Sequence, residues 1–213
     1  MPKQKRRWKY VAERWEGILY GPESNGSTCP NSKLFDMGKK LQAQATYLLE
    51  PPPDCVDCCS LVVKEINGVC NNSISGHGGV LTATGTCLVL RSQDAPFVVI
   101  EHQRTGHLAA ATANLDLVVG KNITCGPQNI ISALLNTLGV TRSSDFRVWI
   151  VAGIATTECP QNVRQMIHGI LTDTWRIPEK QVNFDQRCVA ATPGLASAVA
   201  NKPGENMLFI IKK

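Results

Sequence analysis

A cysteine and a histidine occupy matching positions in two adjacent apolar segments. Cys87 begins the segment CLVLR (87–91), and His102 follows the segment PFVVIE (96–101), with only SQDA between the two. Apolar segments with so short a connection predict a β-hairpin, which would bring Cys87 and His102 to one edge of a sheet. There the histidine could take the proton of the thiol, and the thiolate could attack an electrophilic carbon.

The residues before Cys87 could support such a reaction. Gly85 permits a sharp turn before Thr86, so that backbone amides near the thiol can point at a developing oxyanion. A hydroxyl from Thr82 or Thr84 could orient the imidazole through its second nitrogen. The non-catalytic alternative stays open, because a free cysteine is often simply a small buried residue.

Two further histidines offer alternative partners for the thiol. His77 lies in the glycine loop SGHGG (75–79), and His107 follows His102 by five residues. A zinc ion held by His77, Cys87 and either His102 or His107 is chemically possible, but the spacing supports it poorly. The sequence therefore predicts a site without a metal or another cofactor.

A second cysteine cluster, CVDCC (55–59), contains the pattern CxxC at Cys55 and Cys58, followed directly by Cys59. A zinc knuckle needs a second pair of ligands, and the nearest candidates are Cys70 and His77. Without such a pair, the cluster predicts buried or redox-active thiols.

The distribution of apolar residues predicts the elements that position these side chains. Strands are expected at 59–66, 87–91, 96–101, 115–120, 146–153, 181–184 and 206–212, and helices at 34–49, 129–139 and 162–175. A run of strands followed by alternating helices and strands predicts an α/β fold, in the form of a layered sandwich with a mixed sheet.

The charge is concentrated at the N-terminus. Residues 1–15 carry six positive charges and one negative charge, which equals the formal net charge of +5 for the whole chain. The segment Lys3–Lys9, with aromatic residues among its cations, could contact nucleic acid or an acidic partner, although a solvated tail is the simpler interpretation. We therefore expect a basic arm at 1–20, a loop and helix extension at 21–54, and an α/β domain at 55–213.

Composition and cysteine usage limit the class of protein. Hydrophobic residues make up 43% of the chain and charged residues 18%, which excludes a wholly disordered chain. No stretch is long and apolar enough for a membrane span, and the first residues lack the apolar segment of a signal peptide. The nine cysteines are an odd number without a disulfide framework. We expect a cytoplasmic protein with mostly free thiols and no membrane contact.

The segments LTATGTCLVL (81–90) and FVVIEH (97–102) resemble the Cys–His deamidase superfamily, in particular the CheD glutamine deamidases. This superfamily also includes the catalytic domain of cytotoxic necrotizing factor and the laccase-domain (YfiH-like) proteins. The resemblance continues through NIISALLNTLGV, FRVWIVAGIA and NVRQMIHGIL and covers roughly residues 60–185. It implies a CheD/YfiH-like fold.

The resemblance also implies roles for particular residues. Cys87 matches the family nucleophile, His102 the general base and Thr82 the orienting threonine. The stretch between that threonine and the cysteine is one residue shorter than in CheD, so Thr84 is an alternative. The implied reaction is hydrolysis of a carboxamide: a glutamine side chain on a protein substrate forms a thioester with Cys87, ammonia leaves, and His102 activates water.

Two alternatives remain from the sequence. IATTEC (154–159) and RCVAATPGLASAVAN (187–201) resemble segments of the laccase-domain branch, which implies a purine nucleoside phosphorylase or adenosine deaminase, with zinc as an optional ligand. In this chain HQRTGH (102–107) replaces the His-Ala-Gly-Trp signature of that branch, and Val199 replaces its terminal arginine. The other alternative is a non-catalytic interaction module whose contact is the basic arm.

Overall fold

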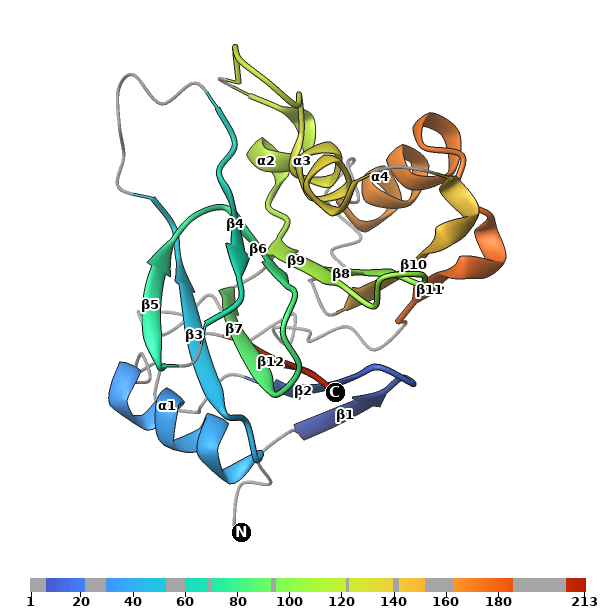
Figure 1. Cartoon of the computed structure of the whole chain (residues 1–213). Coiled ribbons are helices and arrows are strands. Elements are labelled where there is room, and N and C mark those ends of the chain that lie inside the picture. The colour runs from blue at the N-terminus through green and yellow to red at the C-terminus, as the bar shows by residue number, and fades with distance from the viewer. Residues whose placement is uncertain are drawn as a thin grey trace, which may run out of the picture.

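The computed structural model describes residues 7–21, 30–52, 60–68, 70–92, 95–121, 123–139, 142–151, 163–185 and 206–213. These residues form two six-stranded sheets, which stack face to face, with helices on both outer sides (Figure 1). The expected α/β sandwich with mixed sheets is confirmed.

The first sheet has the order β1-β2-β12-β7-β3-β5. Its strands are β1 (Arg7–Val11), β2 (Trp15–Tyr20), β12 (Asn206–Lys212), β7 (Thr86–Ser92), β3 (Ala45–Glu50) and β5 (Asn72–Ser75). Helix α1 (Asn31–Lys40) covers the outer face of this sheet (Figure 1).

The second sheet has the order β11-β10-β8-β9-β6-β4. Its strands are β11 (Val182–Phe184), β10 (Phe146–Val151), β8 (Phe97–His102), β9 (Leu108–Thr112), β6 (Gly78–Leu81) and β4 (Val63–Ile66). The outer face of this sheet carries α2 (Leu115–Val119), α3 (Ile130–Leu138) and α4 (Val163–Gly169), and a π-helical turn (Ile170–Thr174) continues α4 (Figure 1).

The strands read as continuous apolar runs because they are buried on both faces. In β7, Leu88 and Leu90 face the core between the sheets, and Val89 packs towards α1. In β8, Val99 faces the core between the sheets, and Ile100 packs towards α3. A run buried on both faces gives no alternation from which to infer its sheet or its partner strand.

This ambiguity explains why the predicted hairpin is wrong. β7 pairs with β3 and β12, whereas β8 pairs with β9 and β10. The short segment between them carries the chain from one sheet to the other. The two apolar segments are strands, as predicted, but they belong to different layers.

The segment expected to be a basic arm contains two strands of the first sheet. β1 and β2 form an antiparallel pair, and β2 also pairs with β12. Tyr10 and Trp15 are buried in the core between the sheets, because the rings and the cations alternate along the chain and only the rings face inwards. The first sheet therefore contains strands from each of the three segments 1–20, 21–54 and 55–213.

Two of the predicted elements have a different secondary structure. The helix predicted at 34–49 is α1 followed by β3, and the break occurs at Gln42, which has a φ of 63°. The strand predicted at 115–120 is the helix α2. There Asn114 caps the first turn through a hydrogen bond from the Leu117 amide at 2.8 Å, and Gly120 ends the helix with a φ of 81°.

Candidate functional site

Cys87 lies in the core between the first sheet and α1. Its side chain is fully buried, in a cluster that includes Leu34 of α1 and Phe209 of β12. Burial raises the pKa of the Cys87 thiol to about 12, because apolar surroundings disfavour the thiolate. The thiol is therefore protonated at neutral pH and shielded from ligands.

His102 lies in the other layer of the sandwich. It ends β8, and its ring contacts the ring of Phe146 edge-on, with 5.1 Å between the centroids. Its Nδ1 accepts a hydrogen bond from the Thr105 amide at 3.2 Å, which leaves the proton on Nε2. Nε2 is buried, and no described residue is within hydrogen-bond distance of it. The structure does not bring His102 and Cys87 together, because their side chains pack into different outer layers.

Within the described ranges, no hydrogen bond joins Thr82 or Thr84 to this imidazole. The amide and the hydroxyl of Thr82 both donate to the carbonyl of Ile66, so Thr82 secures the end of β4. Thr84 is exposed. The hydroxyl in contact with the His102 ring is that of Thr105, at 3.0 Å from Nδ1.

Gly85 makes the predicted sharp turn, with a φ of 74°. Its amide donates to the carbonyl of Lys212, and the neighbouring Thr86 is buried in β7. The Gly85 amide therefore serves the first sheet, and it is not available to an oxyanion. His107 is half-buried, and its carbonyl accepts the amide of His102. Burial and the nearby Lys212 lower the pKa of His107.

The residues proposed as zinc ligands do not come together. Within the described ranges, no three His, Cys, Asp or Glu side chains are close enough to hold a metal ion. His77, Cys87 and His102 belong to three different environments, so this donor set does not fit zinc. The cluster CVDCC (55–59) and the laccase-like segments 154–159 and 187–201 lie outside the described residues.

The buried thiol leads to a direct prediction. We expect Cys87 to resist alkylation by iodoacetamide in the native protein at pH 8 and to react only after denaturation, because the thiol is inaccessible and protonated. Mass spectrometry of the labelled peptides gives the measurement, and the exposed Cys70 and Cys125 serve as internal controls. Labelling of native Cys87 as fast as Cys70 would contradict this placement.

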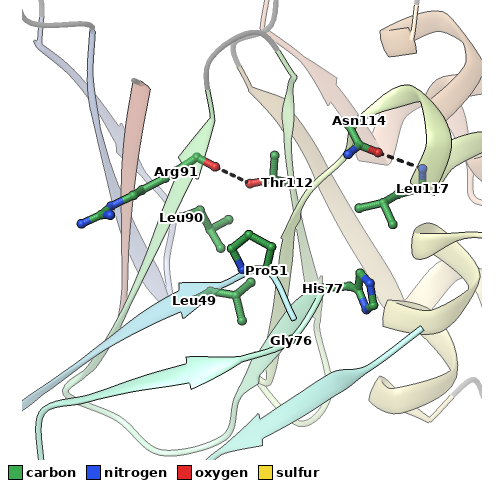
Figure 2. Close-up of a pocket in the computed structure, with 9 residues that line it drawn as sticks. All are labelled: Leu49, Pro51, Gly76, His77, Leu90, Arg91, Thr112, Asn114 and Leu117. Atoms are coloured by element: carbon green, nitrogen blue, oxygen red, sulfur yellow. Dashed lines mark hydrogen bonds between the residues drawn. The ribbon is translucent and has the colours of Figure 1, made fainter. Parts of the chain in front are cut away.

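A pocket lies at the end of β7 that is farther from Cys87 (Figure 2). Both sheets and α2 contribute to it, and its volume is about 480 Å³, including the part open to solvent. The lining residues are Leu49, Pro51, Gly76, His77, Leu90, Arg91, Thr112, Asn114 and Leu117. Arg91 follows Cys87 by four positions in β7, so the pocket is roughly 13 Å from the thiol along the strand.

Two lining residues, His77 and Arg91, carry titratable side chains, and of these only the imidazole of His77 can be neutral at physiological pH. Its Nδ1 accepts the backbone N–H of Val62 at 3.0 Å, and its own backbone N–H donates to the carbonyl of Val62. Burial lowers the pKa of His77. The imidazole is therefore neutral with its proton on Nε2, so His77 offers an N–H donor.

Further polar groups come from Thr112, the last residue of β9, and from Asn114, which caps α2. The Thr112 hydroxyl donates its hydrogen to the carbonyl of Arg91 at 3.0 Å, so its oxygen remains available as an acceptor. The Asn114 Oδ1 accepts the Leu117 amide, which leaves the Nδ2 group as a donor. Figure 2 shows both hydrogen bonds, with the Asn114 nitrogen on the side of Thr112.

The remaining walls are mainly apolar. Leu49, Leu90 and Leu117 contribute side chains from three different elements. The Arg91 guanidinium extends away from the pocket (Figure 2), where it donates to Asn31 Oδ1 at 2.8 Å. A concave, mostly apolar site with a few directed polar groups is the usual form of a small-molecule site.

No protein-family model matches this sequence, and no curated protein matches it. Solved structures are similar in fold. The hypothetical protein YfiH from Bacillus licheniformis superposes with a TM-score of 0.64 at 11% identity, over 93% of each chain. This chain has a YfiH-like α/β fold.

Two further structures are similar to this chain. YlmD from Geobacillus stearothermophilus gives a TM-score of 0.60 at 12% identity, over 94% of this chain and 93% of YlmD. The Neisseria meningitidis protein NMB0706, described by the family model DUF152, gives 0.54 at 12% identity, over 98% of this chain and all of that one. At such identities the similarity concerns the fold, and it agrees with the YfiH-like branch of the expected resemblance.

Of the residues that line this pocket, the sequence singles out His77 alone, as an alternative partner for Cys87 and as a possible zinc ligand. Thr112 and Asn114 had no motif of their own, although Asn114 before LDLVV is a helix N-cap signal that could have indicated α2. Among the described helices, none is long and apolar enough to cross a membrane.

Proposed function

We propose that the pocket binds a purine nucleoside and that the protein is a purine nucleoside phosphorylase. The observation that carries this proposal is the pocket of a YfiH-like fold in which apolar walls surround the N–H donors of His77 and Asn114. Apolar walls suit the faces of a purine ring, and directed donors suit the acceptor atoms on its edge.

The donors also suit the chemistry of phosphorolysis. A phosphate oxygen forms a bond to C1′ of the ribose while the bond from C1′ to N9 breaks, and the electron pair of that bond stays on the purine. The hydrogen of the hydrogen phosphate ends on the purine ring. Hydrogen bonds from His77 Nε2 and Asn114 Nδ2 would stabilise the negative charge that develops on the leaving purine. This reaction requires no nucleophile from the protein.

The other reactions expected from the sequence have less support in this structure. Glutamine deamidation requires a reactive thiol, but Cys87 is buried, protonated and distant from the pocket. Adenosine deamination requires an activated water, which enzymes commonly obtain from a metal ion. In the described lining of the pocket, His77 Nε2 and Asn114 Nδ2 are donors, so neither can take a proton from such a water.

The proposal predicts a binding defect at His77. We expect His77→Phe to weaken the binding of inosine by about tenfold, because one hydrogen bond of about 1.4 kcal/mol is lost while the ring is retained. Isothermal titration calorimetry gives the affinity, and release of hypoxanthine in the presence of inorganic phosphate gives the turnover.

His107→Phe is the matched control. His107 is another half-buried histidine with a lowered pKa, and it lies at the other end of the second sheet. This variant should bind inosine like the unmodified protein. The proposal is wrong if no purine nucleoside binds, or if binding occurs without any phosphate-dependent release of the base.

A further inference from the structure

We propose that the open edge of β1 binds an extended acidic segment of a partner protein, which joins the first sheet as a further strand. β1 is the outermost strand of this sheet, and β2 is its only partner among the described strands (Figure 1). An outermost strand carries a row of unpaired backbone N–H and C=O groups, with which an extended peptide can pair. β1 contributes no residue to the described lining of the pocket, so this surface is separate from the proposed function.

The turn between β1 and β2 shows which backbone groups face the open edge. The Ala12 N–H donates to the Trp15 carbonyl at 3.0 Å, one residue beyond the pair of Val11 and Glu16. Pairs with and without mutual hydrogen bonds alternate along an antiparallel ladder, so the N–H and C=O of Val11 point away from β2. Every second residue of β1 shares this orientation, which gives three outward residues, namely Arg7, Lys9 and Val11.

The side chains of the same three residues form an exposed strip, which we call the β1 strip. Val11 is 66% exposed, and Arg7 and Lys9 are exposed as well. Lys9 pairs with Glu16 at 3.2 Å, but Lys213 pairs with the same carboxylate at 3.1 Å. Within the described ranges, no carboxylate pairs with Arg7. The β1 strip therefore carries more positive charge than its surroundings neutralise.

The edge is held in its extended form by contacts on the other face of β1. The Tyr10 ring is buried between the sheets, and its hydroxyl donates to the carboxylate of Asp185, which follows β11. This hydrogen bond joins the outermost strands of the two sheets. A strand that is already fixed loses little conformational entropy when another strand is added to it.

The charges argue against a second copy of this chain as the added strand. Antiparallel pairing of two β1 strands would place Lys9 opposite Lys9 or, after a shift by two residues, Arg7 opposite Lys9. Like charges directly opposite each other destabilise a strand pair, and lysine on an edge strand is a common protection against self-pairing. Carboxylates at the same positions would form favourable pairs. The charge of the β1 strip thus favours an acidic segment of another protein.

Antiparallel pairing specifies the spacing of the acidic residues. Side chains on one face of a strand recur at every second residue, and the added strand runs in the direction opposite to β1. The residue opposite Val11 therefore comes first, followed at every second position by those opposite Lys9 and Arg7. The expected segment has an apolar residue and then two acidic residues, each separated from the previous one by a single residue.

A peptide with this pattern tests the proposal on the unmodified protein. The probe is fluorescein-labelled Thr-Val-Thr-Glu-Thr-Glu-Thr, and fluorescence polarisation gives its Kd. We expect saturable binding, which weakens by about tenfold or more when the backbone nitrogens of the valine and the glutamates are methylated, because these N–H groups face β1. Methylation of the two threonine nitrogens between them is the matched control. Those N–H groups face away from β1, so the Kd should change by less than about threefold.

Val11→Pro tests the same hydrogen bonds from the side of the protein. It removes one outward N–H and leaves both cations, and proline is tolerated on an edge strand where the N–H faces solvent. We expect it to weaken peptide binding by about fivefold more than Val11→Ala, which keeps the N–H. Lys9→Gln should weaken binding by about threefold. Lys64→Gln should have no effect, because Lys64 is an exposed lysine on β4, an edge strand of the second sheet.

Four results would overturn the proposal. The first is the absence of saturable peptide binding. The second is equal binding of the two methylated peptides, which would show attraction by charge alone. The third is tighter binding of a short oligothymidylate than of the peptide, which would assign the β1 strip to nucleic acid. The fourth is a dimer of the unmodified protein that Val11→Pro dissociates, which would assign the edge to a second copy.

Discussion

Replacement of Trp15 by alanine should lower the free energy of unfolding by about 3 kcal/mol, the lower end of the range for a buried tryptophan. The ring is fully buried between the two sheets, and it meets the ring of Trp149 edge-on, with 4.9 Å between the centroids. A Cβ at Gly17 would lie 2.6 Å from this ring, so the ring occupies the space that a side chain at position 17 would need. The indole N–H has no acceptor among the described residues, which reduces the expected loss.

Urea unfolding followed by circular dichroism gives the measurement. Trp8→Ala is the matched control, because Trp8 lies on the paired strand β1 and is only half-buried. We expect it to cost less than half as much as Trp15→Ala. Equal effects of the two substitutions, or a Trp15 effect below about 1 kcal/mol, would argue against burial of the N-terminal strands in the core.

Burial of the N-terminal strands also limits what a deletion of the N-terminus can show. A deletion of residues 1–15 would remove β1 and Trp15 together, so a loss of function in that deletion would report loss of the fold. The alternation of cations and rings in this segment is accounted for by a strand with one buried face. The residues before Arg7 lie outside the described part, and contact of Lys3–Lys9 with an acidic partner or nucleic acid stays a prediction.

Gly120→Ala should be at least as damaging as Trp15→Ala, with an expected loss above about 3 kcal/mol. Gly120 ends α2 with a φ of 81°, in the left-handed region that disfavours a side chain. A Cβ there would lie 1.9 Å from the carbonyl oxygen of Gln128, and a backbone atom cannot move away as a flexible side chain can. The structure must therefore shift around α2.

Gly139→Ala separates the cost of the positive φ from the cost of the close contact with Gln128. Gly139 also ends a helix, with a φ of 77°, but a Cβ there meets no described atom within 4 Å. We expect this substitution to cost about 1 to 2 kcal/mol, from the backbone conformation alone, because a side chain is disfavoured at a φ of 77° and a ψ of 92°. Chemical denaturation of both variants gives the comparison. Similar losses in the two would show that the close approach between Gly120 and Gln128 is not as tight as the structure has it.

The same substitution connects stability with the pocket. α2 carries Leu117 and is capped by Asn114, and both residues line the pocket. A shift of α2 in Gly120→Ala should therefore weaken the binding of inosine beyond what the loss of stability explains. The wall of the pocket thus depends on a helix of five residues that is fixed by its cap and its final glycine.

Local patterns in the sequence determined much of the secondary structure. The periodic segments became α3 and α4, and the apolar segments became β7, β8, β10 and β12, because burial of an apolar face requires the spacing that each element imposes. The segment LDLVV (115–119) is an exception. Its composition suits a strand, but the hydrogen bond at Asn114 and the left-handed Gly120 favour a helix.

Only the tertiary structure decided which residues meet. Cys87 and His102 have the spacing of a hairpin site, yet a four-residue connection can equally carry the chain from one sheet to the next layer. The pocket, by contrast, joins His77, Arg91 and Thr112 from separate elements. The hydrogen-bonding roles of His77 and Thr112 are imposed by distant partners, Val62 for His77 and Arg91 for Thr112. Such long-range pairing has no local pattern in the sequence, because packing between layers brings these groups together.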